Sequence, residues 1–191
     1  MKTSYVQFDE METYEHTKLK PLSIPIAIRA KTGEIISLQV AEMAAKGHTA
    51  KKSVEKYGPR KDDRNRACSL AIESISKVAK DKITIVCDGR PAYPNLIHKM
   101  IPECKIERYI NKKLHKLPDS TDEYVVEMQE NIESVKRKKF DPLFMLNHVC
   151  AKLRADLSRL IRRTWSGTKS MSRLQCHLDL YIAYQNGYSI V

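Results

Sequence analysis

Two aspartates follow stretches with the composition of buried β-strands. Asp9 comes after residues 4–8, and Asp88 comes after the apolar run 83–87 and directly before Gly89. Metal-assisted cleavage of a phosphodiester needs carboxylates that converge from different elements, because Mg²⁺ prefers hard oxygen ligands. Strand ends can carry such groups, so we expect Asp9 and Asp88 to lie side by side at one edge of a sheet.

Each of these aspartates also has a plainer interpretation. Asp9 belongs to an acidic segment with Glu10, Glu12 and Glu15, and it can simply be solvated. Asp88 can be the turn residue of an Asp-Gly pair. Glu10 either supports Asp9 from behind or is solvated as well. The catalytic interpretation therefore depends on the two aspartates occurring together.

Hydrophobic periodicity indicates the elements that must position these residues. The expected strands are 4–9, a hairpin formed by 22–30 and 35–40 around the turn 31–34, then 82–87 and 105–110. The expected helices are 65–80, 93–101, one long amphipathic helix over 142–163, and 174–184.

This order predicts one α/β domain over residues 1–191. Three antiparallel strands followed by β-α-β units describe an RNase H-like mixed sheet, flanked by helices and ending in long basic helices over 142–186. We interpret 44–64 as a basic loop or short helix and 111–139 as an exposed polar insertion. Asp141 is expected to cap the long helix, with Pro142 as its first residue.

The charge points to an anionic partner. The chain has 191 residues and a formal net charge of +11, and such a surface attracts polyanions, nucleic acid foremost. The residues expected to hold DNA phosphates are Lys152, Arg154, Arg159, Arg162, Arg163 and Lys169, with Arg173 as an extension. A second candidate patch comprises Lys46, Lys51, Lys52, Lys56, Arg60 and Lys61. The alternative for both is an ordinary solvated basic surface.

Two aromatic and apolar features near the C-terminus are expected to be core. Trp165 can stack on an unpaired base, but we expect it to pack inside the protein. The segment carrying Leu178, Leu180, Tyr181 and Tyr184 is expected to be core as well, with dimerisation as the alternative.

The cysteines and the hydropathy exclude several protein classes. Five cysteines, with no CxxC pair, favour neither a zinc knuckle nor a disulfide framework, so we expect reduced and mostly buried thiols. There is no apolar stretch of membrane-spanning length and no secretory signal, which predicts a cytoplasmic protein without a membrane partner.

Several motifs together resemble a known family. Residues 8–11 (Phe-Asp-Glu-Met), the turn 31–33 and residues 86–89 (Val-Cys-Asp-Gly) resemble DDE-type insertion-sequence transposases, and residues 153–165 and 177–181 look like the C-terminal half of the insertion sequence one group. The similarity extends over most of 6–186 and is weakest at 111–139.

This resemblance implies a transposase catalytic domain with an RNase H-like fold. It implies two Mg²⁺ or Mn²⁺ ions, cleavage and strand transfer at insertion-element ends, and DNA as substrate and target. It further implies a homodimer or higher oligomer in the cytoplasm of a prokaryote, associated with the nucleoid, and an upstream-encoded module that recognises the element ends.

The family also implies a glutamate on the long helix, and here the sequence departs from it. Counting seven residues back from Arg154 gives Asn147, so the implied catalytic and metal-binding set is Asp9, Asp88 and Asn147. Asn147 is a neutral ligand, or the enzyme is weakened or inactive, or His148 or Asp141 completes the site. The rival functions are an RNase H-fold nuclease and a DNA-binding remnant without catalysis.

Overall fold

A mixed β-sheet places the N-terminal strand at its centre. The computed structural model describes residues 2–109, 141–161 and 165–187. The strands are β1 (Thr3–Tyr14), β2 (Pro21–Arg29), β3 (Ile35–Leu38), β4 (Ala41–Glu42), β5 (Ala79–Asp88) and β6 (Lys105–Tyr109). Their order is β3-β2-β1-β5-β6, and β4 pairs with β2.

The pairing of these strands confirms the predicted fold class. β1, β2 and β3 are antiparallel neighbours, whereas β1, β5 and β6 run parallel. The parallel pairs need crossover connections, which α2 and α3 provide. This arrangement of an antiparallel hairpin beside parallel β-α-β units is the RNase H-like topology.

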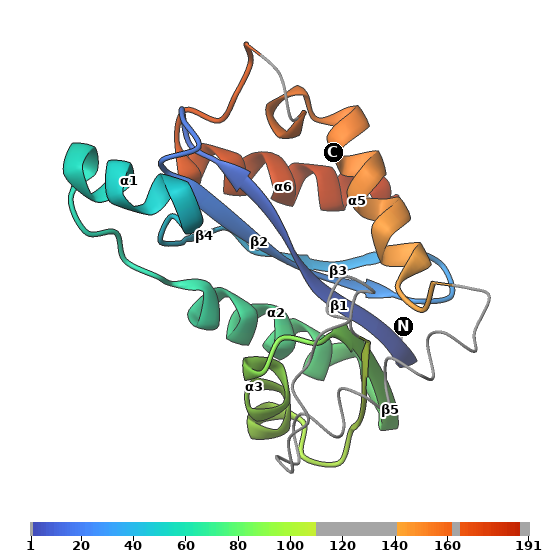
Figure 1. Ribbon diagram of the computed structural model, residues 1–191. Helices are drawn as coiled ribbons and strands as arrows, with labels where there is room; N and C mark the ends of the chain where they lie inside the picture. The colour runs from blue at the N-terminus through green and yellow to red at the C-terminus, as the bar shows by residue number, and fades with distance from the viewer. Residues whose placement is uncertain (1, 110–140, 162–164, 188–191) are drawn as a thin grey trace.

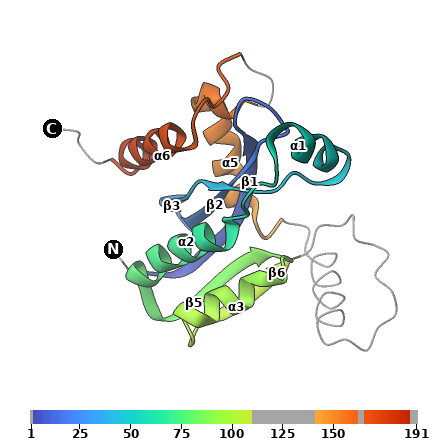
Figure 2. The same ribbon diagram turned by 90° about the vertical axis from the view of Figure 1, so that its left-hand side faces the viewer.

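Helices cover both faces of the sheet. They are α1 (Ala50–Tyr57), α2 (Arg64–Val78), α3 (Ala92–Met100), α5 (Phe144–Asp156) and α6 (Met171–Gln185), with short 3₁₀ turns η1 (Gly47–Thr49) and η2 (Ser158–Leu160). Figures 1 and 2 show α2 and α3 on one side of the sheet and α5 and α6 on the other.

Alternating residues of the strands bury two separate cores. Val6, Phe8 and Ile85 pack under α2 and α3, while Met11 and Ile26 belong to the cluster under α5 and α6. Because successive side chains of a strand point to opposite faces, this alternation also defines the face on which each polar residue of β1 lies.

The strand expected over 4–9 is longer than predicted, and Asp9 lies in its middle. Residues 10–14 have a polar composition, but they continue in register with β2, from Glu10 opposite Pro25 to Tyr14 opposite Pro21. The backbone ladder and the burial of Met11 therefore outweigh the local polarity. Asp9 is nevertheless at the end of β1's pairing with β5, which stops at Phe8 and Cys87.

The single helix expected over 142–163 is wrong in its extent. α5 begins at Phe144 and ends at Asp156, because Leu157 is extended with φ −106° and ψ 102°. The following turn η2 returns Leu160 to the same core. The regular spacing of the leucines therefore extends over a helix, a break and a 3₁₀ turn, and it does not indicate one continuous helix. Residues 111–139, Arg162 and Arg163 lie outside the described residues.

Two expectations about the C-terminal region are also corrected. Trp165 does not pack in the core, since its side chain is fully exposed. In α6, Leu178 and Tyr181 are buried as expected, but Leu180 and Tyr184 face solvent because they lie on the opposite side of the helix.

The cysteine and membrane expectations can be compared with the described part of the chain. All five cysteines are unpaired, and all but Cys176 are buried. None of the helices in the described ranges combines the length and apolar character needed to cross a bilayer.

Candidate functional site

The register of β1 and β5 brings Asp9 and Asp88 together. Phe8 pairs with Cys87 in the parallel ladder, so the two aspartates are the next neighbours along these strands. They share the face of Gln7 and Val86, because side chains two residues apart point the same way. Their carboxyl groups are close enough to interact, because the charge of Asp88 adds to burial in raising the pKa of Asp9. The expected meeting of two distant acids at one place on the sheet is therefore present in the structure.

The surroundings of the two carboxyl groups oppose their simultaneous ionisation. Burial, followed by the charge of Asp88, raises the pKa of Asp9 well above its ordinary value, although the nearby Tyr93 hydroxyl acts in the opposite direction. Burial also raises the pKa of Asp88, partly offset by the backbone N–H of Arg90. Two carboxylates forced together in a half-buried place form a site that a proton or a cation stabilises.

α5 lies directly above this pair of acids. Gln7, on the same face of β1, accepts a hydrogen bond at its side-chain oxygen from the backbone N–H of Leu146 at 2.8 Å. Its amide nitrogen donates to the carbonyl of Pro142 at 2.7 Å. Further along α5, Cys150 belongs to the same buried cluster as Met11 of β1. The helix therefore runs along β1 in the direction from Gln7 to Asp9.

Helical periodicity places Asn147 on the flank of α5 that faces β5. Leu143 packs against Val86 of β5 and Tyr109 of β6, and Asn147 is one turn further on the same side of the helix. The N–H of Asn147 donates to the Leu143 carbonyl at 2.9 Å, so Asn147 lies one helical turn beyond Leu143.

The side chain of Asn147 is exposed and oriented by Asp141. Its amide nitrogen donates to Asp141 Oδ2 at 2.7 Å, which leaves its carbonyl oxygen without that constraint. Asp141 Oδ1 accepts from the backbone N–H of Leu143 at 2.9 Å. The predicted N-cap is therefore wrong: Asp141 forms a turn before α5, whose N-cap is Leu143 and which begins at Phe144, two residues later than expected.

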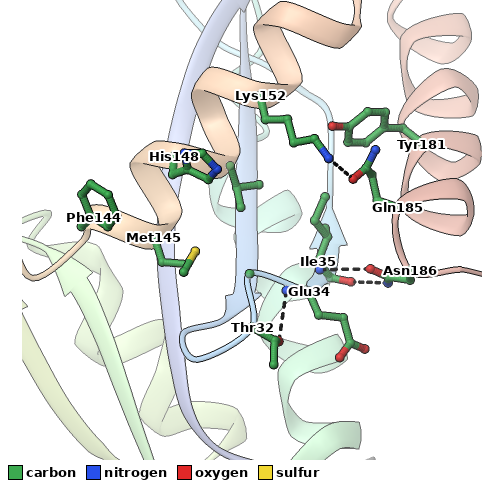
Figure 3. Close-up of a pocket in the computed structure, with 12 residues that line it drawn as sticks. Thr32, Glu34, Ile35, Phe144, Met145, His148, Lys152, Tyr181, Gln185 and Asn186 are labelled. Atoms are coloured by element: carbon green, nitrogen blue, oxygen red, sulfur yellow. Dashed lines mark hydrogen bonds between the residues drawn. The ribbon is translucent and has the colours of Figure 1, made fainter.

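The two alternative ligands do not join the aspartates. His148 lines a groove of about 590 Å³ on the other flank of α5, facing the β2–β3 turn and the end of α6. Figure 3 shows this groove, and the His148 ring is stacked with Phe144 at 6.4 Å between centroids. Among the described residues, no three His, Cys, Asp or Glu side chains form a metal-binding cluster. Within the described part of the chain, neither Asp141 nor His148 therefore forms such a cluster with Asp9 and Asp88.

The available donors fit a hard divalent cation with an incomplete ligand set. Two carboxylates and an amide oxygen are suitable ligands for Mg²⁺, which retains several waters. The mutual destabilisation of Asp9 and Asp88 would be relieved by such a cation. The neutral amide in place of a third carboxylate supplies less charge, so binding is expected to be weaker than at a three-acid site.

Glu10 lies on the opposite face of β1 and is not solvated. Its carboxylate forms an ion pair with Arg90 and accepts hydrogen bonds from Tyr93 Oη at 3.1 Å and Ser23 Oγ at 2.5 Å. Glu10 had two interpretations from its sequence context, and neither Arg90 nor Tyr93 is among the residues predicted for the site. The signal that could have found both is their position, two and five residues after Asp88.

The predicted DNA-binding residues fall on different surfaces. Arg154 is seven residues after Asn147, on the same flank of α5, and its charge reaches Cys150. Lys152 lines the groove on the other flank and bonds Gln185. Arg159 is half-buried in η2, and Lys169 is exposed before α6.

The second basic patch is partly neutralised by neighbouring acids. Lys46 lies 3.4 Å from Glu12, and Arg60 lies 3.5 Å from Glu42. Lys61 is 3.0 Å from Asp63. The patch over 46–61 is consequently less positive than its composition indicates.

Neither a protein-family model nor a curated protein matches this chain. The topology and the geometry around Asp9 and Asp88 therefore carry the functional argument.

Proposed function

We propose that this chain is the catalytic domain of a DNA transposase that cleaves and rejoins phosphodiesters with Mg²⁺ or Mn²⁺. The observation that carries the proposal is the position of Asp9 and Asp88 as neighbours on adjacent parallel strands of an RNase H-like sheet. The net charge of +11 supports a polyanionic substrate.

Asp9 and Asp88 would hold the divalent ions, and the amide oxygen of Asn147 would be the third, weaker ligand. Bound ions supply activation of water or a 3′-hydroxyl and stabilise the leaving oxygen. Asp141 orients Asn147 by accepting from its amide nitrogen, so that the carbonyl oxygen is the atom available for ligation. Arg154, on the same flank of α5, would hold a phosphate near the acids.

Metal-dependent joining of DNA ends tests this function. The substrates are a labelled short duplex with a free 3′-hydroxyl and a supercoiled plasmid, incubated with the protein and Mg²⁺ or Mn²⁺. We expect labelled plasmid with the wild type and none with Asp88→Ala, whereas the exposed acid variant Glu12→Gln retains joining. Salt-sensitive DNA binding should remain in Asp88→Ala.

The same reaction separates the proposal from its rivals. Plasmid nicking without joining would indicate an RNase H-fold nuclease. DNA binding without metal-dependent chemistry would indicate a regulator or remnant, an alternative that the neutral Asn147 favours. Joining that survives Asp88→Ala would contradict the proposed site.

Asn147→Glu distinguishes the interpretations of the third ligand. A transposase that merely lost its acid should join DNA faster with this variant. A protein adapted to asparagine should join more slowly, and a remnant with other defects should not change.

A further inference from the structure

The carboxylate of Glu10 and the guanidinium of Arg90 form an ion pair behind the two aspartates. The Glu10 side chain is 10% exposed and that of Arg90 is 21% exposed, so the pair is shielded from water. Glu10 extends from β1 on the face opposite Asp9, toward α2 and α3. Its carboxylate also accepts hydrogen bonds from Ser23, Tyr93 and Cys68.

Arg90 is held by more than its ion pair. The guanidinium donates to Asn65 Oδ1 at 2.8 Å, and it lies over the Tyr93 ring at 5.4 Å from the centroid. A planar fork that reaches several partners at once is a property of arginine that lysine does not share. The position of residue 90 is thereby determined by side-chain contacts to α2, α3 and β1.

The backbone of each partner in this ion pair holds one of the aspartates. The N–H of Glu10 donates to Asp9 Oδ1 at 2.7 Å. The N–H of Arg90 donates to Asp88 Oδ1 at 3.1 Å. The side-chain pair therefore connects two backbone donors, and each donor holds one carboxylate of the candidate site.

We propose that Glu10 and Arg90 form a positioning clamp that keeps the carboxylates of Asp9 and Asp88 facing one another for a divalent cation. This inference rests on the proposed function and deepens it, since it assigns the residues that orient the ligands. Two negative carboxylates repel, so each would rotate away from the other unless something held it. The two N–H donors oppose that rotation, and the ion pair fixes the distance between the donors.

The clamp also explains why an acid can lie next to the candidate site without belonging to it. Arg90 neutralises Glu10, so the carboxylate on the reverse face of β1 adds no unpaired negative charge behind Asp9. Outer groups that orient metal ligands commonly change metal affinity by 10- to 100-fold when they are removed.

Binding of Mn²⁺ alone, followed by electron paramagnetic resonance, tests the clamp. The variants are Glu10→Gln and Arg90→Met, with Arg90→Lys as the conservative change, and thermal unfolding is measured for each. The matched control is Arg29→Met, which removes another buried arginine that forms an ion pair, with Glu34 at 2.8 Å. Asp88→Asn reports whether the Mn²⁺ is bound at the candidate site.

We expect Glu10→Gln and Arg90→Met to weaken Mn²⁺ binding by about tenfold or more. Arg90→Lys should weaken binding less, and Arg29→Met should leave the affinity unchanged even where its melting temperature falls. Amide hydrogen exchange gives a readout without metal: the N–H of residue 90 should exchange faster in Glu10→Gln than in the wild type.

The outcomes separate the clamp from the proposed function. If Asp88→Asn abolishes Mn²⁺ binding while Glu10→Gln and Arg90→Met bind like the wild type, the clamp is overturned and the site remains. If Asp88→Asn does not weaken Mn²⁺ binding, the site itself is wrong and the clamp falls with it. A loss of affinity that Arg29→Met reproduces would show that lost stability, and not positioning, is the cause.

Discussion

The side-chain oxygen of Gln7 accepts a hydrogen bond from the backbone N–H of Leu146, so the first strand caps the helix that carries Asn147. Leu146 lies in the first turn of α5, where backbone N–H groups have no partner within the helix. The Gln7 amide nitrogen also donates to Pro142. A single buried glutamine in β1 thereby sets the height of α5 above Asp9.

Gln7→Leu is expected to lower the free energy of unfolding by about 1–3 kcal/mol, because Leu146 N–H and the Pro142 carbonyl lose their partner inside the protein. Urea unfolding measures this change. Gln39→Leu is the control, since the Gln39 amide bonds only locally to Ser37. An equal loss in both variants would contradict the capping role.

Asp9→Asn is expected to stabilise the protein at neutral pH. The pKa of Asp9 is raised in the folded state, so the folded protein binds this proton more tightly than the unfolded chain does. The stability that Asp9 contributes is therefore present at low pH. It is lost as the pH rises above 3.8, the ordinary pKa of an aspartate.

Calorimetry at pH 7 and below pH 4 checks the sign of this effect. The melting temperature of Asp9→Asn should exceed that of the wild type by at least about 2–4 °C at pH 7, the equivalent of 1 kcal/mol in a chain of this size. The advantage should shrink at the lower pH. Glu12→Gln, an exposed acid on the same strand, should show neither change, and a destabilised Asp9→Asn at pH 7 would refute the argument.

Divalent cations are expected to raise the melting temperature of the wild type at neutral pH. A ligand that binds only the folded state stabilises it by RT ln(1 + [L]/Kd), which is about 2.7 kcal/mol at a concentration of one hundred times Kd. Differential scanning fluorimetry with Mg²⁺ and Mn²⁺ measures the shift. The shift should disappear in Asp88→Asn, and equal shifts in both proteins would place the cation elsewhere.

The contact between Asn147 and Asp141 predicts how a third acid can be restored. In the wild type, Asp141 accepts a hydrogen bond from the Asn147 amide. Asn147→Glu alone replaces this donor with a carboxylate next to Asp141, and like charges in contact repel. The double variant Asn147→Glu with Asp141→Asn restores an amide donor opposite a carboxylate. We expect Mn²⁺ affinity to rise in both variants and more in the double variant. A lower affinity in the double variant than in Asn147→Glu would contradict this pairing.

DNA binding is expected to depend steeply on salt. The variant Arg154→Ala tests whether the DNA lies along α5. If Arg154 contacts one phosphate, Arg154→Ala should reduce the slope of log K against log [salt] by about 0.9. Fluorescence anisotropy with a labelled duplex at several salt concentrations measures the slope. Lys77→Ala is the control, because the Lys77 ammonium is exposed on α2, lies 2.9 Å from Glu73 and belongs to neither basic patch. An unchanged slope in Arg154→Ala would place the DNA on another surface.

The order of strands and helices follows from local information. Apolar residues alternate in 22–30 and have helical spacing in 65–80. Both patterns reflect burial against one face of the sheet, and both can be recognised in the sequence alone. β2, α2 and the buried strand before Asp88 therefore lie close to where the sequence predicts them. The same reasoning selected Asp9 and Asp88, because each follows a run with strand composition.

The tertiary structure decided the features that depend on partners distant in the chain. β1 continues past Asp9 because β2 supplies a ladder for its polar half, and Trp165 is exposed although its side chain is apolar. The break after Asp156 is invisible to periodicity, since η2 returns Leu160 to the same core. Glu10 and Arg90 are separated by 80 positions. No local pattern pairs them, and only the parallel register of β1 and β5 brings their side chains into contact.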